Sequence, residues 1–594
     1  MNKYSKIIAA ATALLLTFSA CGTAEAAGES INTTTSYQTE QTETAAASKS
    51  EMFTERDLSG EYDEAEAVSI TLNGTTATAT ANSSSAASAA AGVNVSGSTV
   101  RITQEGTYIL SGSLSDGMII VDADEAAKVQ IVLDGASVTS QTSAALYVKS
   151  ADKVFITTAA GTQNTLANGG TFTAIDDSNI DGAVFAKDDI TFNGSGSLTV
   201  TSPVGHGIVG KDDVKLAGGT ITVTAARHGV QANDSVRVAQ ADITITAEGK
   251  DGIHVSDSSD AESGEASDSY FYMADGTLTI SAGDDGIHAD AEARIEGGTI
   301  DITKSYEGIE ALSIIVSGGD IDLAASDDGF NAAGGSTQGS STFGDDDWSG
   351  GQGGFPGGGG FSDGGSNGSI EISGGNVSIT AGGDGVDSNG SVEISGGYTV
   401  VTGPTSGDTA VLDYNSTGVI TGGTFIGTGG AGMAQGFSSV SGQGLIEVSV
   451  GSQSAGTTVQ LTDANGAVIA EVTPDLDYAV VYISTPDMAQ GNTYTLTAGT
   501  YSETIDLTEA MYSSLAGGRG GSLGGMGPRQ GMNGQNGMQG RGHGGHGQMR
   551  DGGNMPDVQG RPDANTGASQ LPDDNSDETG GAPQNGFLGE GSQA

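Results

Sequence analysis

The chain has 594 residues and is strongly acidic, with 74 Asp and Glu against 21 Lys and Arg and a formal net charge of −53. A surface of this charge repels the phosphates of nucleic acids, which argues against nucleic acid as a partner. The 98 glycines, the low aromatic content and the alternation of Thr, Ser, Val and Ile are typical of short strands joined by tight turns, not of a helical protein.

The N-terminus has the features of an export signal. Two lysines precede the apolar stretch 7–18, which is too short to span a membrane, and small residues then lead to Cys21, the only cysteine. This arrangement resembles a bacterial lipobox, although Phe18 stands where Leu, Val or Ile is usual. It predicts a signal peptide over 1–21 and an exported, lipid-anchored protein on the cell surface, which contacts the membrane only through its anchor. The alternative is an ordinary signal peptide cut near Ala27.

Composition divides the rest of the chain into four parts. Residues 22–66 are rich in Ser, Thr, Glu and Ala without a period, which predicts a disordered tether. Residues 67–440 are short strands separated by Gly or Asp-Gly, with a Gly-rich insertion at 334–368. Residues 441–510 have the pattern of antiparallel strands and predict a small β module or cap, whereas 511–594 predict a disordered Gly-rich tail.

The strands of the central part recur every 21 to 23 residues or so, a period typical of stacked coils. Alternation places Ile and Val inward and Thr, Ser and Asp outward. We therefore expect an all-β fold, a right-handed parallel β-helix whose coils have at least two strand faces joined by Gly turns. The glycines that mark the repeat are Gly207, Gly229, Gly252, Gly286, Gly308, Gly329 and Gly385.

Alignment of the coils by these glycines places polar residues in two columns, with about 4.8 Å between neighbouring strands. The first column is the residue before each glycine, and the second column is the residue two positions after the glycine. The residue directly after the glycine, between it and the second column, should point into the core. The first column holds His206, His228, Asp251, Asp285, Glu307, Asp328 and Asp384. The second holds Val209, Gln231, His254, His288, Glu310, Asn331 and Asp387.

Carboxylates this close together ionise at a cost unless a cation neutralises them, and Ca²⁺ takes six to eight oxygen ligands. We predict calcium on this edge, with Asp285, Glu307 and Asp328 as the favoured ligands and Glu310 nearby. Histidines in adjacent coils suggest zinc as an alternative. A hydrogen-bonded ladder of polar turn residues without any ion is another. The full set of predicted metal ligands is Asp251, Asp284, Asp285, Asp290, Glu307, Glu310, Asp327, Asp328, Asp384 and Asp387.

Several motifs recur in order along the chain: Gly-Thr-Tyr-Ile-Leu-Ser-Gly at 106–112, Val-Leu-Asp-Gly-Ala at 132–136, Ala-Asp-Lys-Val at 151–154 and Asp-Asp-Gly-Ile-His-Ala-Asp at 284–290. Together they resemble a family of bacterial calcium-binding, carbohydrate-binding proteins with a right-handed parallel β-helix similar to polysaccharide lyases. The resemblance covers 67–507. It implies binding of plant-type polysaccharides, such as cellulose or polygalacturonate, at the cell surface.

Binding without catalysis is favoured over lyase activity. A calcium-dependent lyase of the pectate type needs a basic residue to abstract a proton, and basic residues are few; Lys250 and Arg227 are the candidates. A structural or adhesive surface protein is the third alternative. Sugar rings pack on exposed aromatic side chains, for which the candidates are Tyr270, Tyr272, Tyr306 and Trp348.

Overall fold

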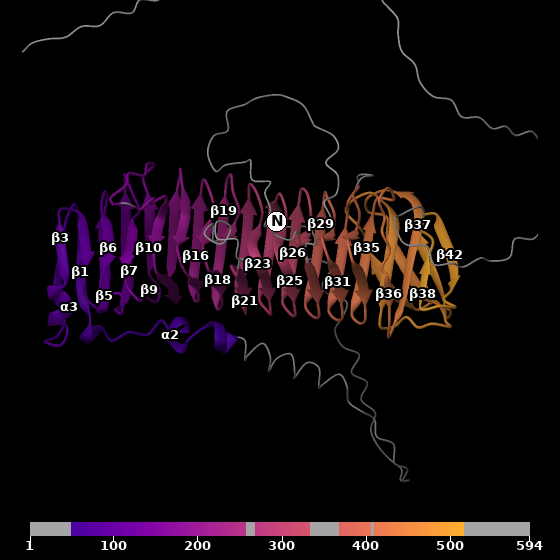
Figure 1. The fold of residues 1–594 in the computed structure, drawn as a ribbon, viewed down its shortest axis with the longest axis horizontal. Helices are drawn as coiled ribbons and strands as arrows, with labels where there is room; N and C mark the ends of the chain where they lie inside the picture. Colours follow the sequence, from indigo (N-terminus) through magenta and orange to yellow (C-terminus); the bar gives the residue numbers. More distant parts are fainter. Residues whose placement is uncertain (1–48, 177, 257–267, 333–367, 406–408, 516–594) are drawn as a thin grey trace, which may run out of the picture. The chain divides into compact units, whose positions relative to one another are not determined.

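The described residues form a stack of β-strand coils. Corresponding strands of successive coils pair in parallel, side by side along the row (Figure 1). This is the all-β parallel β-helix that the repeat predicts. All described residues belong to the first of two compact units, Met1–Ser522. The computed structural model describes residues 49–176, 178–256, 268–332, 368–405 and 409–515.

Several sequence predictions lie outside the described residues. They concern the signal peptide with Cys21, most of the Gly-rich insertion with Trp348, and the tail from residue 516 onward. Within the described part of the chain, no helix is both long and apolar enough to cross a membrane.

Each coil contributes one strand to each of three sheets, which we number in the order in which the chain visits them within a coil. In a typical coil, β14, β15 and β16 pair respectively with β17, β18 and β19 of the next coil. Sheet 1 consists of β4 (Thr99–Ile102), β6 (Met118–Asp122), β8 (Leu146–Ser150), β11 (Gly182–Ala186), β14 (His206–Gly210), β17 (Val230–Ala232), β20 (Ile253–Val255), the first halves of β23 (Ile287–Ile295) and β25 (Ile309–Val316), β27 (Phe330–Ala332), β30 (Val386–Ser388) and β33 (Leu412–Tyr414).

The other two sheets complete the coils. Sheet 2 consists of β1 (Val68–Gly74), β5 (Gly106–Leu114), β7 (Lys128–Ser140), β9 (Lys153–Thr158), β12 (Asp189–Gly194), β15 (Val214–Leu216), β18 (Ser235–Val238), β21 (Tyr270–Met273), the second halves of β23 and β25, β28 (Ser369–Ile372), β31 (Ser391–Ile394), β34 (Thr417–Ile420) and β36 (Ser439–Val440). Sheet 3 consists of the end of β7, then β10 (Gln163–Asn168), β13 (Ser197–Ser202), β16 (Gly219–Ala225), β19 (Ala241–Ala247), β22 (Thr277–Ala282), β24 (Thr299–Ser305), β26 (Asp320–Ala325), β29 (Asn376–Ala381), β32 (Tyr398–Thr402) and β35 (Thr424–Gly429).

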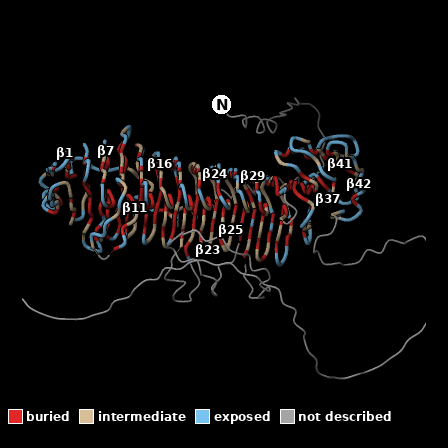
Figure 2. The backbone as a smooth tube through the Cα atoms, turned by 90° about the horizontal axis from the view of Figure 1, so that it is seen from above, coloured by how far each residue is buried: buried red, intermediate tan, exposed pale blue. Residues whose placement is uncertain are grey.

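The core fills the inside of the coils because side chains alternate along each strand. In β19, Ile243 and Ile245 are buried whereas Asp242 and Thr244 are exposed. The same alternation of buried and exposed positions recurs from coil to coil (Figure 2). Each buried Ile or Val contributes about 1.5–3 kcal/mol relative to an exposed one, so the repeated aliphatic positions hold the coils together.

Glycine recurs at two places in the central coils, for different reasons. The second glycine of each Gly-Gly pair has a positive φ, as at Gly319 (+89°) and Gly375 (+80°), a conformation that glycine adopts without strain. The glycine between the two polar columns is needed for close stacking instead. A Cβ on Gly308 would lie 2.3 Å from the carbonyl oxygen of Gly329 in the next coil. The backbones of successive coils therefore pack closely beside the polar columns.

Additional elements cover both ends of the coil stack. At the N-terminal end, β2 (Ala77–Ala81) pairs antiparallel with β1, α3 (Ala87–Ala91) follows, and β3 (Val93–Ser96) pairs antiparallel with β4. At the C-terminal end, β40 (Tyr478–Thr485) pairs antiparallel with both β35 and β37 (Gly444–Gln453), and β43 (Met511–Ser513) runs parallel to β37. The remaining strands β39 (Val468–Val472), β38 (Val459–Asp463), β41 (Thr493–Ala498) and β42 (Tyr501–Asp506) form a separate antiparallel sheet.

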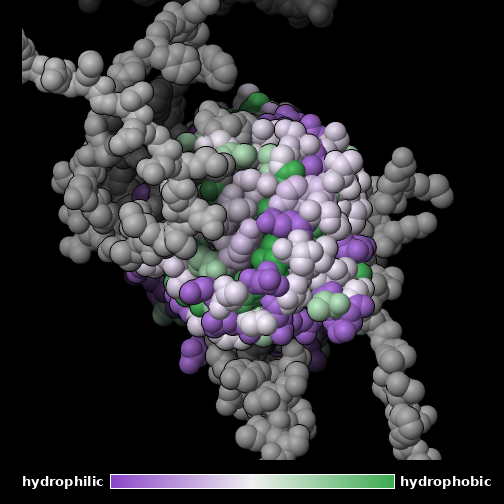
Figure 3. Space-filling model, turned by 90° about the vertical axis from the view of Figure 1, so that its right-hand side faces the viewer, coloured by the Kyte–Doolittle hydropathy of each residue, from purple (hydrophilic) through white to green (hydrophobic). Residues whose placement is uncertain are grey.

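This C-terminal end presents few hydrophobic residues to solvent. Figure 3 looks onto this end and shows a surface of mostly hydrophilic or intermediate hydropathy with small hydrophobic patches. Such a cover hides the last strands of the coils, whose unpaired edges would otherwise be available to other chains.

Residues 49–62, which we call the strap, run along the outside of sheet 2 (Figure 1). They include the short helix α2 (Glu55–Leu58), and the 3-10 helix η1 (Glu64–Glu66) follows. Asp57 is fully buried and forms ion pairs with Lys153 (2.9 Å) and Lys215 (3.3 Å). Although burial opposes its charge, these lysines and the Thr54 amide hold the pKa of Asp57 well below its usual range. The strap thus corrects the prediction that all of 22–66 is a disordered tether.

Candidate metal and carbohydrate site

The two polar columns predicted from the repeat lie side by side at the start of sheet 1. In the second column, residues pair in register from Val209 and Gln231 through to Asp387. The residues between the columns, such as Ile253 and Phe330, are fully buried, as predicted. We call the polar members the polar edge: His206, His228, Asp251, Asp285, Glu307, Asp328 and Asp384 from the first column, and Gln231, His254, His288, Glu310, Asn331 and Asp387 from the second.

Most first-column side chains form a hydrogen-bonded ladder. Each accepts the backbone N–H of the corresponding residue in the next coil, so one side-chain atom is used for stacking and the other remains available. The hydrogen-bonded alternative considered from the sequence is therefore present, and it leaves the second carboxylate oxygen of each aspartate of the ladder available as a ligand. The acceptors and donors are His206 Nδ1 and His228 N (3.2 Å), His228 Nδ1 and Asp251 N (3.2 Å), Asp251 Oδ1 and Asp285 N (3.1 Å), Asp285 Oδ1 and Glu307 N (3.1 Å), and the carboxylates of Asp328 and Asp384 with Asp384 N and Ala410 N.

Four histidine rings stack along one half of the polar edge. The ring centroids of His206, His228, His254 and His288 lie 5.0, 4.3 and 4.9 Å apart in that order, and the rings are nearly parallel. Burial lowers the pKa of His206 to about 2, and it lowers that of His228 to about 4 although Asp251 opposes the shift. These two rings are therefore neutral at pH 7.

His288 differs from the other three rings because carboxylates surround it. Its Nδ1 lies 2.6 Å from Glu310 and its Nε2 lies 3.2 Å from Asp290. Burial opposes its charged form, but these two groups and Asp285 outweigh burial and hold the pKa of His288 well above its usual value. Both nitrogens donate, so His288 is an imidazolium that serves as the counter-ion of its acidic neighbours.

The other half of the polar edge consists of carboxylates and Asn331 and contains no histidine. Burial raises the pKa of Asp328 to about 6 and those of Asp384 and Asp387 to about 7, and the neighbouring carboxylates add to each shift. Burial also raises the pKa of Glu307 to about 8 and that of Asp285 to about 6. Groups with raised pKa values lose part of their charge at neutral pH unless a cation compensates them.

The structure gathers most of the predicted metal ligands into small groups whose ligand atoms all lie within 4.8 Å of one another. In the described part of the chain, none of these groups contains Glu307, which instead accepts a hydrogen bond from Asn331 (2.9 Å). Of the favoured trio, Asp285 and Asp328 therefore belong to different groups and Glu307 to none of them. The groups are His228, Asp251 and His254; Asp285, His288 and Glu310; Asp251, Asp284 and Asp285; and Asp328, Asp384 and Asp387.

The remaining predicted ligands have other partners. Asp290 accepts from Ser256 (2.8 Å) in addition to its contact with His288. Asp327 is hydrogen-bonded to the hydroxyl of Tyr306, and this bond, together with the charge of Asp327, raises the pKa of that tyrosine to about 12. Tyr306 itself is 49% exposed, so an accessible aromatic ring lies next to the carboxylate half of the polar edge.

The structure does not bear out Tyr270 and Tyr272 as exposed platforms. Tyr272 is fully buried, packs near Phe53 of the strap at 6.3 Å between ring centroids, and donates to Glu296. Tyr270 lies under the Arg237 guanidinium, 5.2 Å from its ring centroid. Both belong to β21 on sheet 2, whose outer surface the strap covers. The sequence signal for this contact is a capping-box pattern that begins at Thr54 and ends at Asp57. An apolar pair that includes Phe53 comes directly before it.

The two candidate bases lie beside the histidine half of the polar edge. Arg227 and Lys250 are both half-buried, and each directly precedes a first-column residue. Lys250 lies close enough to Asp284 to oppose the effect of burial on the pKa of that carboxyl group. Arg227 thus lies next to a histidine, and Lys250 lies next to an acidic group.

Comparison with known proteins agrees with the motifs. Residues 96–344 match a family model described as carbohydrate-binding domain-containing protein. This confirms the resemblance to carbohydrate-binding proteins. A relative from Acetivibrio thermocellus with the same description is 39% identical over 135 residues, which cover 22% of this chain and 47% of the relative. The chain therefore spans about half the length of this relative.

A solved structure from the same comparisons is described as the polysaccharide lyase-like protein from C. thermocellum, gadolinium derivative. It is 32% identical, and the match covers 45% of this chain and 97% of that one, with a TM-score of 0.35.

Proposed function

We propose that this protein binds an acidic polysaccharide of the polygalacturonate type without cleaving it, and that calcium on the polar edge takes part in the binding. The carbohydrate-binding family match supplies the ligand class. The observation that carries the proposal is the group formed by Asp328, Asp384 and Asp387, with the exposed ring of Tyr306 on the same edge.

The three carboxylates suit calcium by their chemistry and spacing. Ca²⁺ binds oxygen ligands at about 2.3–2.6 Å, so ligands on opposite sides of the ion lie about 5 Å apart. Atoms from Asp328, Asp384 and Asp387 all lie within 4.8 Å of one another and include no nitrogen. Asp413 pairs in register with Asp387 and adds a fourth carboxylate nearby. Bound calcium would neutralise these groups and offer positive charge to a ligand.

Charge explains why the ion is needed for an acidic polymer. The chain carries a net charge of −53, which repels a polyuronate. Calcium at the polar edge can join the protein carboxylates to those of the polymer, while Tyr306 provides an apolar face for a sugar ring. A neutral polymer such as cellulose would depend on the aromatic contact and much less on the ion.

A calcium-dependent lyase is the second candidate, and one observation favours it. Lys250 lies beside the group of Asp251, Asp284 and Asp285, so a basic residue adjoins an acidic cluster. In such a reaction the lysine would have to be neutral to accept the proton next to the uronate carboxylate. A structural or adhesive role, in which calcium only stiffens the coils, is the third.

The test is retention of the full chain on polygalacturonate and on cellulose, with calcium or with chelator, while the ultraviolet absorbance of unsaturated products is followed. We expect calcium-dependent retention on polygalacturonate without product. The Asp384→Asn/Asp387→Asn variant should lose this retention. The matched control Asp322→Asn, an exposed carboxylate on sheet 3, should keep it. Product formation would favour the lyase, and absence of retention on either polymer would favour the structural role.

We further propose that the protein is exported and held at the cell surface by a lipid on Cys21. The apolar stretch and small residues before this cysteine support the proposal. Incorporation of labelled fatty acid into the wild type but not into Cys21→Ser tests it. Equal labelling of both chains would contradict it.

A further inference from the structure

We propose that His228, Asp251 and His254 form a metal site separate from the calcium site, and that it takes a late first-row divalent cation such as Zn²⁺. His228 stands just before β17, whereas Asp251 and His254 stand just before and within β20 of the next coil. The site would therefore join two successive coils.

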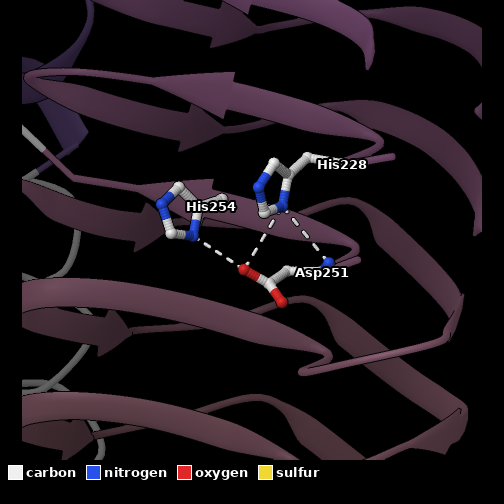
Figure 4. Close-up of side chains that lie close together, drawn as sticks. All are labelled: His228, Asp251 and His254. Carbon is white, nitrogen blue, oxygen red and sulfur yellow. Dashed lines mark hydrogen bonds and ion pairs between the residues drawn. The ribbon is translucent and has the colours of Figure 1, made fainter. Parts of the chain in front are cut away.

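A nitrogen of each histidine faces the same oxygen of Asp251, and ligand atoms of the three residues lie within 4.8 Å of one another (Figure 4). Asp251 Oδ2 lies 3.3 Å from His228 Nδ1 and 2.7 Å from His254 Nδ1. Zinc binds nitrogen and oxygen at about 2.0–2.2 Å with tetrahedral geometry, which places neighbouring ligand atoms about 3.4 Å apart. The first distance already has this value. The second is that of a hydrogen bond whose proton the metal would replace.

An unfavourable contact at His228 points to a cation. Its Nδ1 accepts the backbone N–H of Asp251 at 3.2 Å, so this nitrogen carries no proton. The same nitrogen faces Asp251 Oδ2, and both residues are buried, with 8% and 4% of their surfaces exposed. Two electron-rich atoms therefore oppose each other away from solvent, which is costly without a positive charge between them. Metal binding would exchange two hydrogen bonds, this ladder bond and the one between His254 and Asp251, for three metal–ligand bonds.

The donor set selects against calcium. Two imidazole nitrogens and one carboxylate oxygen suit zinc and its neighbours, whereas calcium prefers oxygen alone. Asp251 offers a single oxygen because its Oδ1 already accepts from Asp285 N at 3.1 Å. A fourth position is left for water, and the His254 side chain is 22% exposed, which provides access from solvent.

Neighbouring charges favour a dication at this place. Asp284 and Asp285 form a further group with Asp251, so two extra carboxylates lie beside the ligands, together with the cations Lys250 and Arg227; the ligand Asp251 adds a third negative charge. The similar group around His288 is not equivalent, because both nitrogens of that ring already donate to carboxylates.

The experiment is a zinc titration of the full, metal-stripped chain in excess calcium, which fills the oxygen-only sites. Two further histidines, His543 and His546, lie outside the described residues, so the titration is done in the His543→Ala/His546→Ala background. We expect one tight zinc equivalent and a higher melting temperature. Cobalt in the same site should give the strong visible absorption of a tetrahedral centre.

Two ligand variants and one control decide the outcome. His254→Gln and His228→Asn should each weaken zinc binding at least about tenfold. The asparagine keeps an oxygen for the Asp251 N–H, as Asp251 itself provides for the next coil, so the ladder is preserved. Asp384→Asn should leave zinc binding unchanged. Zinc affinity that survives both histidine variants, or that is lost in Asp384→Asn, would overturn the proposal, as would the weak cobalt spectrum of an all-oxygen octahedral site. Because the calcium proposal rests on Asp384 and Asp387, the two can fail independently.

Discussion

At the scale of single residues, the polar edge depends on glycine as much as on its acidic side chains. Gly286 and Gly308 bring the backbones of adjacent coils so close that a Cβ would meet a carbonyl oxygen at 2.6 and 2.3 Å. The polar residue before each glycine is thereby stacked on its counterpart. The sequence predicted both columns, because a fixed offset from a repeated glycine becomes a fixed place in the coil.

Gly308→Ala should therefore destabilise the protein by about 1–3 kcal/mol, since the added methyl group forces the backbone apart. Gly249→Ala is the matched control, because its nearest contact would be 3.2 Å from a single oxygen. Urea unfolding followed by circular dichroism measures both. Equal midpoints for the two variants would show that close stacking does not require glycine here.

The precise grouping of ligands could not be predicted from the columns alone. Glu307 has one more methylene than Asp, and its carboxylate reaches Asn331 instead of joining Asp285 and Asp328. His288 occupies the same place in its coil as His254, in the second column, but three neighbouring carboxylates make it a cation. Side-chain length and local charge decide such details, and neither follows a repeat.

Carboxylate pKa values predict how stability varies with pH in the absence of metal. Asp384 and Asp387 have folded-state pKa values of about 7, above the ordinary value of 3.8. Their contribution to stability is thus fully present below about pH 4 and is lost as pH rises through 7. His206 and His228, whose pKa values are lowered, give the opposite slope below about pH 6.5.

The comparison is therefore between wild type and Asp384→Asn/Asp387→Asn, both with chelator, by melting temperature from pH 4 to 8. Between these limits, wild type should lose more stability than the variant as pH rises. Calcium should restore wild type more at pH 8 than at pH 5, because it binds the charged carboxylates. Parallel profiles for the two proteins would refute this assignment.

At the scale of elements, the strap is the main feature that the sequence did not predict. It lies at the end of the segment 22–66, whose overall composition of Ser, Thr, Glu and Ala is that of a disordered segment, and α2 has only four residues. It is held by a few specific contacts instead of a periodic pattern. Among them, Asn193 donates to the carbonyl oxygens of Arg56, Asp57 and Ser59.

Asp57→Asn should lower stability by about 3–5 kcal/mol, because it leaves Lys153 and Lys215 buried without their shared partner. Asp152→Asn, which removes the exposed ion pair with Lys128, should cost less than about 1 kcal/mol. Urea unfolding gives both values, and proteolysis within 49–62 reports release of the strap. A similar small effect for both variants would mean that the strap contributes little.

At the scale of the whole molecule, the β-helix turns a short repeat into a long row of functional groups. Nitrogen and oxygen donors gather at one part of the polar edge, around His228 and His254, and oxygen donors alone at another, around Asp384 and Asp387. The fold was predictable because the central coils repeat the same pattern of glycine, aliphatic and polar residues. The two proposed classes of cation site on one edge would follow from substitutions within that pattern.

The central claim is that calcium on the carboxylate part of the polar edge joins this protein to an acidic polysaccharide. Calcium titration of the full chain, with and without a short oligogalacturonate, tests it most directly, with the oligomer alone as the blank. If the two ligands meet, each must raise the affinity for the other by the same factor. We predict tighter calcium binding with the oligomer for wild type and for Asp322→Asn, but not for Asp384→Asn/Asp387→Asn. Calcium affinity that is the same with and without the oligomer would contradict the account.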